Sequence, residues 1–405
     1  MNLPIYLDNH ATTMVDPQVM EVMLPYFTQW YGNPSSRMHS FGEKAGEAVD
    51  AARIHVQKLI NAKTDREIIF TAGATEAINH GIKGAARTLK DKGRHIITSV
   101  VEHKAVLKAC AWLEGEGYEV TSLPTDSTGQ VSVESVKNAL RDDTILVAVM
   151  AANNEVGTVN PIGEIGALLA DHQAAFFVDA AQAAGKIPLD VQAMHIDMLS
   201  LSAHKYHGPK GVGALYISRK SGLKLQPLLH GGGQERNRRS GTLNVPGIVG
   251  MGEASRIALQ DLEESAARIR TLRDRLQKHF EDNVEEIIIN GHPTDRLPGN
   301  LNISFTFIEG EGMAMRLRDH VAVSTGSACS SDTLEASYVL LALGLKEMTA
   351  HASIRMGLSK FTTEEEVDYI AEKMIAAVND LREMSPLWQM HKDGVDLDSI
   401  EWSDH

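Results

Sequence analysis

The chain has 405 residues, of which 43% are hydrophobic and 23% charged, values that are ordinary for a globular enzyme of one or two domains. Its formal net charge of −14 argues against nonspecific binding to nucleic acid or to an anionic membrane. No apolar run is long enough to cross a bilayer, and no basic-plus-apolar leader precedes the fold, so we expect neither a membrane span nor a signal peptide. Two cysteines do not make a disulfide framework, which fits a reducing, cytoplasmic location.

The chain begins with a polar segment and helices, and strands and helices alternate from residue 67 onward. Residues 7–13 are polar and extended, a helix is expected from Pro17 to about residue 27, and a turn-rich loop at 32–42 precedes a helix over about 43–60. The predicted strands cover residues 67–71, 95–99, 144–150, 175–178, 196–201 and 212–217. This alternation predicts an α/β domain whose central sheet is mostly parallel.

Polar side chains follow the first five of these strands. They are Thr75, His103, Asn154, Asp179, Gln182, Ser202, His204 and Lys205. Each one has an ordinary explanation by itself, for example Thr75 as a helix cap or His103 as a surface residue. Because ligands of open α/β sheets bind at the carboxyl ends of the strands, five such ends together predict a binding crevice.

Lys205 directly follows a buried apolar strand. A lone lysine in this place usually extends its amine to water. A desolvated amine beside another cationic or aromatic group instead has a lowered pKa and attacks carbonyl carbons. The surrounding set of strand-end residues favours the second interpretation.

The second half of the chain predicts a smaller α+β domain. The loop HGGGQERNRRSGT at 230–242 is either a solvated charge run or a place that holds an anion or a subunit contact. One long helix is expected over about 247–283, followed by strands at 300–306 and 321–324 and helices at 311–318 and 362–381. We expect a large domain at 14–262, and a small domain formed by 1–13 and 263–405.

The strand-end residues suit a ring cofactor that carries a phosphate group. A helix that starts at Gly73, Ala74 and Thr75 supplies backbone donors and a hydroxyl for the phosphate, and Ser202 and His204 add two donors.

The remaining residues suit the ring of such a cofactor. Asp179 can keep a pyridine nitrogen protonated, Gln182 and Asn154 can bond a ring oxygen, and His103 can stack on the ring. Lys205 can form a Schiff base with the aldehyde. A lysine paired with an acidic partner for the pyridinium nitrogen is the protein's part of pyridoxal 5′-phosphate (PLP) chemistry.

The two cysteines have different surroundings. Cys329 lies among small residues, Ser324 to Ser331, which indicates an exposed loop with a nucleophilic thiol. Cys110 has helical neighbours and is better explained as a packed small hydrophobic residue.

Motifs along almost the whole chain resemble the PLP-dependent cysteine desulfurases of the IscS/NifS family, most closely the housekeeping bacterial form. They are LDNHATT, NPSSRMHSFG, AGATEAINHGIKG, EHKAV, NNEVGTVNPI, VDAAQAAGK, SLSAHKYHGPKGVGALY, HGGGQERNRRSGT, STGSACSS, HASIRMGLSKFTTEEEVD and SPLWQMHKDGVDLDSIEW. The resemblance implies the aminotransferase-like PLP fold (fold type I), a homodimer, and conversion of L-cysteine to L-alanine with the sulfur left as an enzyme persulfide.

The resemblance also implies roles for individual residues. Lys205 is the Schiff-base lysine, Cys329 the persulfide cysteine, His103 the stacking acid/base residue and Asp179 the pyridinium partner. Cysteine persulfide also makes Cys329 a candidate transient ligand of an iron–sulfur cluster.

The implied binding contacts complete the set. Residues that match cofactor contacts are Ala74, Thr75, Asn154, Gln182, Ser202 and His204, together with Thr242 from the other subunit. Arg355, with Asn154, matches a clamp for the substrate carboxylate, a group that the guanidinium fork binds bidentately. Ala181, Ala203 and His207 depart from residues common in relatives, but none of these changes removes a chemical role.

The tail and the competing functions leave alternatives open. The tail at 386–405 either packs on its own domain or forms a patch for a partner, which the resemblance implies is an iron–sulfur scaffold protein. A selenocysteine lyase, an aminotransferase on the same fold and a sulfur-trafficking hub are the alternative functions. Cys329 favours sulfur transfer over transamination, and the set of Lys205, Asp179 and His103 favours an enzyme over a hub.

Overall fold

The computed structural model describes residues 2–325 and 335–395 and divides the chain into two compact units. The large unit comprises His10–Ala266 and His292–Leu297, and the small unit comprises Met1–Asn9, Ala267–Gly291 and Pro298–His405. The expected boundary at 13/14 differs from the observed one, because residues 10–13 bond to the large unit. Thr13 donates from its amide (2.9 Å) and its hydroxyl (3.0 Å) to the carbonyl of His204.

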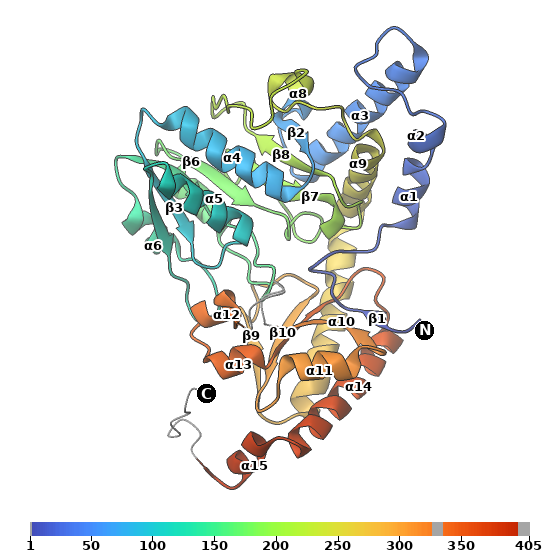
Figure 1. The fold of residues 1–405 in the computed structure, drawn as a ribbon, viewed down its shortest axis with the longest axis vertical. Helices are drawn as coiled ribbons and strands as arrows, with labels where there is room; N and C mark the ends of the chain where they lie inside the picture. Colours follow the sequence, from blue (N-terminus) through green and yellow to red (C-terminus); the bar gives the residue numbers. More distant parts are fainter. Residues whose placement is uncertain (1, 326–334, 396–405) are drawn as a thin grey trace. The chain divides into compact units, whose positions relative to one another are not determined.

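A seven-stranded sheet forms the centre of the large unit (Figure 1). Its order is β2 (Ile68–Thr71), β8 (Gly213–Ile217), β7 (Met198–Ser202), β6 (Ala175–Asp179), β5 (Thr144–Ala148), β3 (His95–Ser99) and β4 (Glu119–Leu123). The strands β7, β6, β5, β3 and β4 pair in parallel, and β8 is antiparallel to both of its neighbours. The predicted α/β class with a mostly parallel sheet is therefore confirmed.

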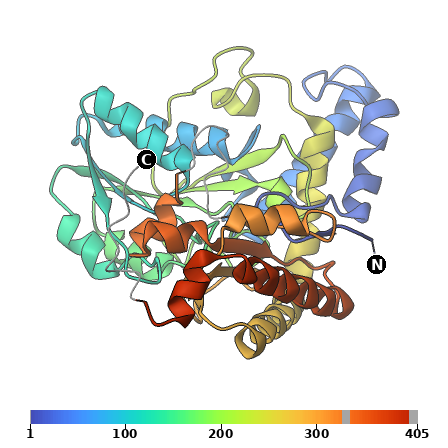
Figure 2. The ribbon, with the colours of Figure 1, turned by 60° about the horizontal axis from the view of Figure 1, so that its bottom comes forward.

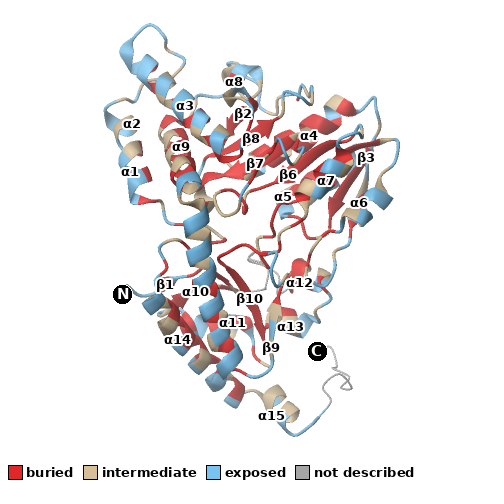
Figure 3. Ribbon diagram, turned by 180° about the vertical axis from the view of Figure 1, so that it is seen from behind, coloured by how far each residue is buried: buried red, intermediate tan, exposed pale blue. Residues whose placement is uncertain are grey.

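Helices cover both faces of this sheet, which explains why its strands are continuous apolar runs. On one face lie α4 (Ala74–Leu89) and α5 (Lys104–Gly115), and on the other lie α1 (Pro17–Met23), α3 (Ser40–Leu59), α6 (Val133–Ala139), α7 (Ile162–Leu169) and α9 (Val245–Gln260). Phe176 and Phe177, adjacent on β6, enter opposite core clusters. Figure 3 shows the inner strands buried along their length, while the helices are buried on one side.

The edge strand β4 has no counterpart among the predicted strands. Its burial is uneven, with Leu123 buried and Glu119 exposed, because one of its long edges has no neighbouring strand. A sequence search for continuous apolar runs therefore overlooks it.

The small unit is built on a four-stranded antiparallel sheet in the order β12 (Ser324–Thr325), β13 (Ser353–Gly357), β10 (Asn300–Phe305) and β9 (Ile287–Asn290). A short parallel pair joins β1 (Ile5–Tyr6) to β11 (Val321–Ala322). Its helices are α10 (Leu262–Asn283), which starts in the large unit and enters the small unit at Ala267, and α11 (Gly310–Leu317), α12 (Tyr338–Ala342), α13 (Glu347–His351), α14 (Glu364–Glu383) and α15 (Pro386–Lys392). Figure 2 shows α10 and α14 side by side, where Leu276, Phe280 and Ile370 share one core with Ile354 of β13.

The single helix expected over residues 247–283 is wrong. The chain forms α9 and α10 with a break at Asp261, whose backbone leaves the helical region (φ −97°, ψ 2°). Aspartate favours such breaks because its side chain competes with the helix for backbone hydrogen bonds. Among the described residues, none of the helices is both long and apolar enough to span a membrane.

Candidate active site

The carboxyl ends of four neighbouring strands carry the predicted site residues. In the sheet order β7, β6, β5, β3, these ends lead to Ser202, Asp179, Asn154 and His103. The charges of Asp179 and Lys205 both act on the pKa of His103. The order of the strands puts these four ends side by side on one edge of the sheet, and the meeting of the side chains there stays a prediction.

Lys205 ends a single 3-10 turn (Ala203–Lys205) that directly follows β7. Its amine Nζ donates to the carbonyl oxygens of His10 (2.6 Å) and Ala11 (2.7 Å). These two carbonyls fix the part-buried amine at a defined point beside the strand ends. Lys205 therefore does not follow the ordinary pattern of a lysine extended into solvent.

Asp179 is the last residue of β6 and is buried, with 4% of its surface exposed. Its Oδ1 accepts hydrogen bonds from the Ser200 hydroxyl (2.7 Å) and from the amide of Ala181 (3.0 Å). These donors hold the carboxylate in one orientation at the strand end. Hydrogen bonds to a carboxylate are stronger than those between neutral groups, so the orientation is well defined.

His103 caps the N-terminus of α5. Its Nδ1 accepts a hydrogen bond from the amide of Ala105 (3.1 Å), so the neutral ring carries its proton on Nε2. Desolvation lowers the pKa of His103; the Asp179 carboxylate opposes this change, and the ammonium of Lys205 adds to it. A neutral imidazole with a fixed tautomer is able to take or give a proton at neutral pH.

Gln182 and His10 form a pair that sequence reasoning did not anticipate. The Gln182 amide donates from Nε2 to the carbonyl of His10 (2.8 Å), and its Oε1 accepts from Lys186 (2.9 Å) and lies 3.1 Å from His10 Nδ1. One Nε2 proton of Gln182 remains for another acceptor. Gln182 and Lys205 thus both bind the carbonyl of His10.

The start of α4 has no side-chain cap. Gly73 caps the helix without any side-chain hydrogen bond, at φ +157°, and Ala74 and the exposed Thr75 form its first turn. The turn lies against β8, where a β-carbon on Gly213 would be 2.7 Å from the carbonyl carbon of Gly73. Glycine is thus required at position 213, and the open amides of α4 suit a phosphate group.

Cationic groups surround the neighbouring His204. Desolvation and the ammonium groups of Lys205, Lys210 and Lys186 lower the pKa of His204 to about 4. Its Nδ1 lies 3.1 Å from the Thr12 hydroxyl. Ser202, 3% exposed, ends the same strand. The positive charges of these lysines therefore favour a neutral His204 ring.

The predicted roles of Arg355, Thr242 and Cys329 stay predictions. Arg355 lies on β13 of the small unit, where Nη2 donates to Asp8 Oδ1 (2.8 Å) and Ser324 Oγ (3.1 Å). Asn154 belongs to the large unit, so the carboxylate clamp that joins the two stays a prediction. Thr242 is exposed between α8 (Gln234–Asn237) and α9, and Cys329 lies outside the described residues.

The glycine-rich loop at 230–242 makes ion pairs within the large unit. Glu235, 7% exposed, accepts two hydrogen bonds of 2.7 Å from Arg53, and Arg239 binds Glu76 of α4 through two contacts (2.8 and 3.1 Å). Residues 235–237 have φ values of +48°, +60° and +64°. The interpretation of Arg239 as a solvated charge is therefore wrong, and a subunit contact of the loop stays a prediction.

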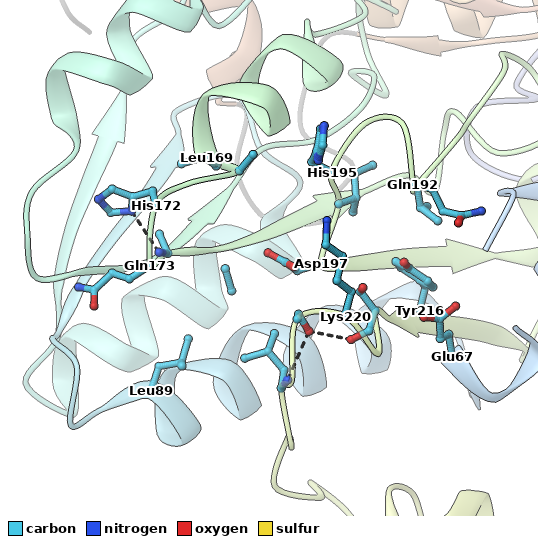
Figure 4. A pocket seen from close by; sticks show the side chains of 18 of the residues that line it. Glu67, Leu89, Leu169, His172, Gln173, Gln192, His195, Asp197, Tyr216 and Lys220 are labelled. Atoms are coloured by element: carbon cyan, nitrogen blue, oxygen red, sulfur yellow. Dashed lines mark hydrogen bonds between the residues drawn. The ribbon is translucent and has the colours of Figure 1, made fainter. Parts of the chain in front are cut away.

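A pocket of about 500 Å³ lies at the opposite, amino-terminal edge of the parallel strands (Figure 4). Glu67 and Asp197 line it, and both carboxylates accept backbone hydrogen bonds, from Arg219 (2.8 Å) and Phe176 (2.9 Å). None of the site residues predicted from the sequence lines it. Within the described residues, no cluster of three or more His, Cys, Asp or Glu side chains is arranged to hold a metal ion.

Comparison with known proteins assigns this arrangement to a family. Residues 5–370 match the model of the class-V aminotransferases, so the chain belongs to that family. A curated relative named "Cysteine desulfurase IscS", from Anaeromyxobacter dehalogenans (strain 2CP-C), is 54% identical over 403 residues, which cover 100% of this chain and 99% of the relative. Within class V, the chain therefore belongs to the IscS cysteine desulfurases, and the predicted family, fold and enzyme class are confirmed.

Solved structures agree with this assignment. A "NIFS-LIKE PROTEIN" is 39% identical, with a TM-score of 0.87, and the match covers 94% of this chain and 100% of that one. The structure named "SspA in complex with cysteine" is 36% identical, with a TM-score of 0.78, and covers 89% of this chain and 100% of its own.

Proposed function

We propose that this chain is a PLP-dependent enzyme that converts L-cysteine to L-alanine and keeps the sulfur as a persulfide on Cys329. The observation that carries the proposal is the sheet order, in which the strands that lead to Lys205, Asp179 and His103 end on one edge of the large unit. Membership of the IscS cysteine desulfurases supports the reaction type. The thiol in the small-residue segment 324–331 supports sulfur transfer, because transamination needs no thiol.

The residues at the sheet edge fit the cofactor. Phosphate would be held by the amides of Ala74 and Thr75 at the start of α4, together with the side chains of Ser202 and His204. When bound, the cofactor supplies an aldehyde for the lysine amine and a ring that accepts electrons from the substrate.

The protein's part is to orient groups and to hold protons. Asp179, fixed by Ser200 and Ala181, would keep a ring nitrogen protonated. His103, neutral with its proton on Nε2, would move protons, and Lys205 starts from a position fixed by two backbone carbonyls. The second Nε2 proton of Gln182 and the side chain of Asn154 would serve the ring oxygen.

The substrate is L-cysteine in this proposal. The solved relative that is in complex with cysteine supports this choice. Arg355 is a suitable partner for the substrate carboxylate because Asp8 and Ser324 already orient its guanidinium group. Thr242 of a second subunit would complete the phosphate contacts, so a homodimer is part of the proposal.

The sulfur transfer balances without an added oxidant. The Cys329 thiolate attacks the sulfur of the bound substrate, so an S–S bond forms as the substrate's C–S bond breaks. The released carbon takes a proton and leaves as L-alanine, and Cys329 becomes a persulfide. This sulfur would then pass to acceptors in the cytoplasm, among them an iron–sulfur scaffold protein, where Cys329 would be a transient cluster ligand.

Absorption spectroscopy of the purified protein tests the proposal. We expect a yellow protein that releases L-alanine from L-cysteine, and a Lys205→Ala variant that no longer holds the cofactor covalently. Lys210→Ala is the matched control, because Lys210 is an exposed lysine near His204 and is expected to leave covalent attachment intact. A colourless protein that gains no colour with added PLP would refute the proposal.

A further inference from the structure

A buried carboxyl group, Glu102, joins two of the loops that carry the site. It has none of its surface exposed, and it lies between the end of β3 and the chain that follows β5. Its Oε1 accepts hydrogen bonds from the hydroxyl of Ser99 (2.9 Å) and from the amide of Met150 (2.8 Å). Glu102 therefore fixes the segment just before His103 to the segment that leads to Asn154.

Two asparagines support the same junction. Asn160 donates to the carbonyl of Met150 (2.8 Å), so both backbone polar groups of Met150 are held. Asn153 donates to the carbonyl of Val101 (3.0 Å), and its Oδ1 accepts the amides of residues 155 and 156 (2.8 and 3.1 Å). The turn around Asn154 is thus bonded to residues 101 and 102, through the side chain of Asn153 and the amide of Met150.

We propose that Glu102 is a positioning residue for the desulfurase reaction, which holds the His103 loop and the Asn154 loop in register beside Asp179. The inference rests on the proposed function, and it assigns to Glu102 a task that the cofactor contacts do not include. Glu102 acts through the loops that it joins.

The burial of Glu102 favours the neutral acid. Ionisable groups of the described residues that act on it include Asp179 on β6 and the thiol of Cys110 on α5. Burial raises the pKa of Glu102 to about 8; hydrogen bonds from Met150 and Ser99 oppose this change, and Asp179 adds to it. At neutral pH the carboxyl therefore keeps its proton and adds no second negative charge beside Asp179.

Two variants separate position from charge. Glu102→Gln keeps the shape of the neutral acid and an oxygen that accepts both hydrogen bonds, whereas Glu102→Ala removes them. We expect the Gln variant to keep kcat within about twofold, and the Ala variant to lose about tenfold or more in kcat with little change in KM for L-cysteine. Glu67→Gln is the matched control, a carboxyl 2% exposed at the other edge of the sheet, and should keep kcat.

Two readouts on the cofactor-free protein do not depend on turnover. In NMR titrations of that protein, the His103 ring should titrate as in the wild type after Glu102→Gln but not after Glu102→Ala. Because the folded pKa of Glu102 lies above its ordinary value, the wild type loses stability as pH rises toward 8 and the Gln variant does not. The Tm of the Gln variant should therefore rise relative to the wild type between pH 6 and pH 8.5.

The outcomes are distinguishable. An Ala variant with wild-type kcat and an unchanged His103 titration would overturn the proposal, as would a Gln variant that fails like Ala. If Glu102→Ala does not fold, the proposal is tested with Glu102→Gln alone. Its kcat should stay near the wild-type value, and its Tm should rise relative to the wild type with pH. A wild-type protein without desulfurase activity would overturn the proposed function, while the His103 titration would still report on Glu102.

Discussion

Individual side chains at this site are held by neighbours that carry no reactive group themselves. Asp179 accepts from Ser200, and Lys205 donates to the carbonyl of His10. Such contacts hold the groups in place before the reaction, and preorganised dipoles of this kind stabilise developing charge effectively. Mutations at the supporting residues should therefore affect turnover in proportion to the contact that they remove.

Asp179 and Ser200 allow a graded test of this idea. Asp179→Ala should reduce kcat/KM by more than a hundredfold, since losing one preorganised electrostatic partner costs about 3 kcal/mol. Ser200→Ala removes one hydrogen bond to the carboxylate and should cost about 1.5–3 kcal/mol, or roughly ten- to a hundredfold. Steady-state kinetics with cofactor content measured by absorbance checks both. Near-native turnover of a PLP-loaded Asp179→Ala protein would contradict the assignment.

Cys329 and Cys110 provide a second residue-scale prediction. Cys110 is 2% exposed, and burial raises the pKa of its thiol to about 12, so it forms almost no thiolate at neutral pH. We expect Cys329→Ser to bind the cofactor but to release little alanine, and Cys110→Ser to stay nearly as active as the wild type. Mass spectrometry after treatment with L-cysteine should find one added sulfur, about 32 Da, on the Cys329 peptide. That mass on the Cys110 peptide would refute the mechanism.

At the scale of elements, the tail divides into a packed helix and a segment outside the described residues. Trp388 of α15 lies 5.5 Å from the ring of Phe307 and 4.4 Å from the guanidinium of Arg382, and Ser385 donates to the carbonyl of Phe307 (2.7 Å). These residues all belong to the small unit, so α15 packs on its own unit. This agrees, for α15, with the alternative that the tail packs on its own domain. None of the residues of α15 is buried, and a partner patch on the tail at 386–405 stays a prediction.

Truncations distinguish the two parts of the tail. Deletion of residues 396–405 should spare cysteine desulfuration and thermal stability but weaken binding of an iron–sulfur scaffold protein. Deletion of 386–405 should have the same effect on binding, and should also lower Tm because Trp388 and its contacts are lost. Calorimetric titration of full-length and truncated proteins measures the binding. Equal affinities for all three would disprove a partner role for the tail.

The surroundings of each element determine whether the sequence alone predicts it. The inner strands are buried on both faces, so their apolar runs marked them, and the strand-end rule then brought Asp179 and His103 together. His10 escaped prediction because it uses a backbone carbonyl, which every residue has, and because it contacts Lys205 across most of the large unit's sequence. Ser200 left a weak signal, since it alternates with Ser202 on an apolar strand.

Glu102 and Arg239 escaped prediction for a related reason. Charged residues in a sequence are most often solvated, and only the tertiary structure shows that Glu102 lies under two loops and that Arg239 pairs with Glu76. Long-range pairing of this kind has no local pattern. Residue roles that depend on it were available only through the family resemblance or through the structure.

The whole molecule carries a further histidine whose protonation opposes folding. His80 of α4 is 1% exposed, and burial lowers its pKa to about 4; Glu76 opposes this change, and Arg238 adds to it. The unfolded chain therefore binds more protons than the folded one between pH 6.5 and about 4. Stability must fall as pH falls through this window.

The expected loss can be measured at one residue. With a folded pKa of about 4 and an ordinary value of 6.5, His80 should cost about 2 kcal/mol of unfolding free energy between pH 7 and pH 5. A His80→Gln variant removes this titration, so its stability should fall less over the same interval. Urea unfolding of the cofactor-free protein at both pH values gives the difference, and His172→Gln, at a partly exposed histidine, is the control. Equal pH dependence of His80→Gln and wild type would show that the buried ring of His80 does not contribute to acid instability.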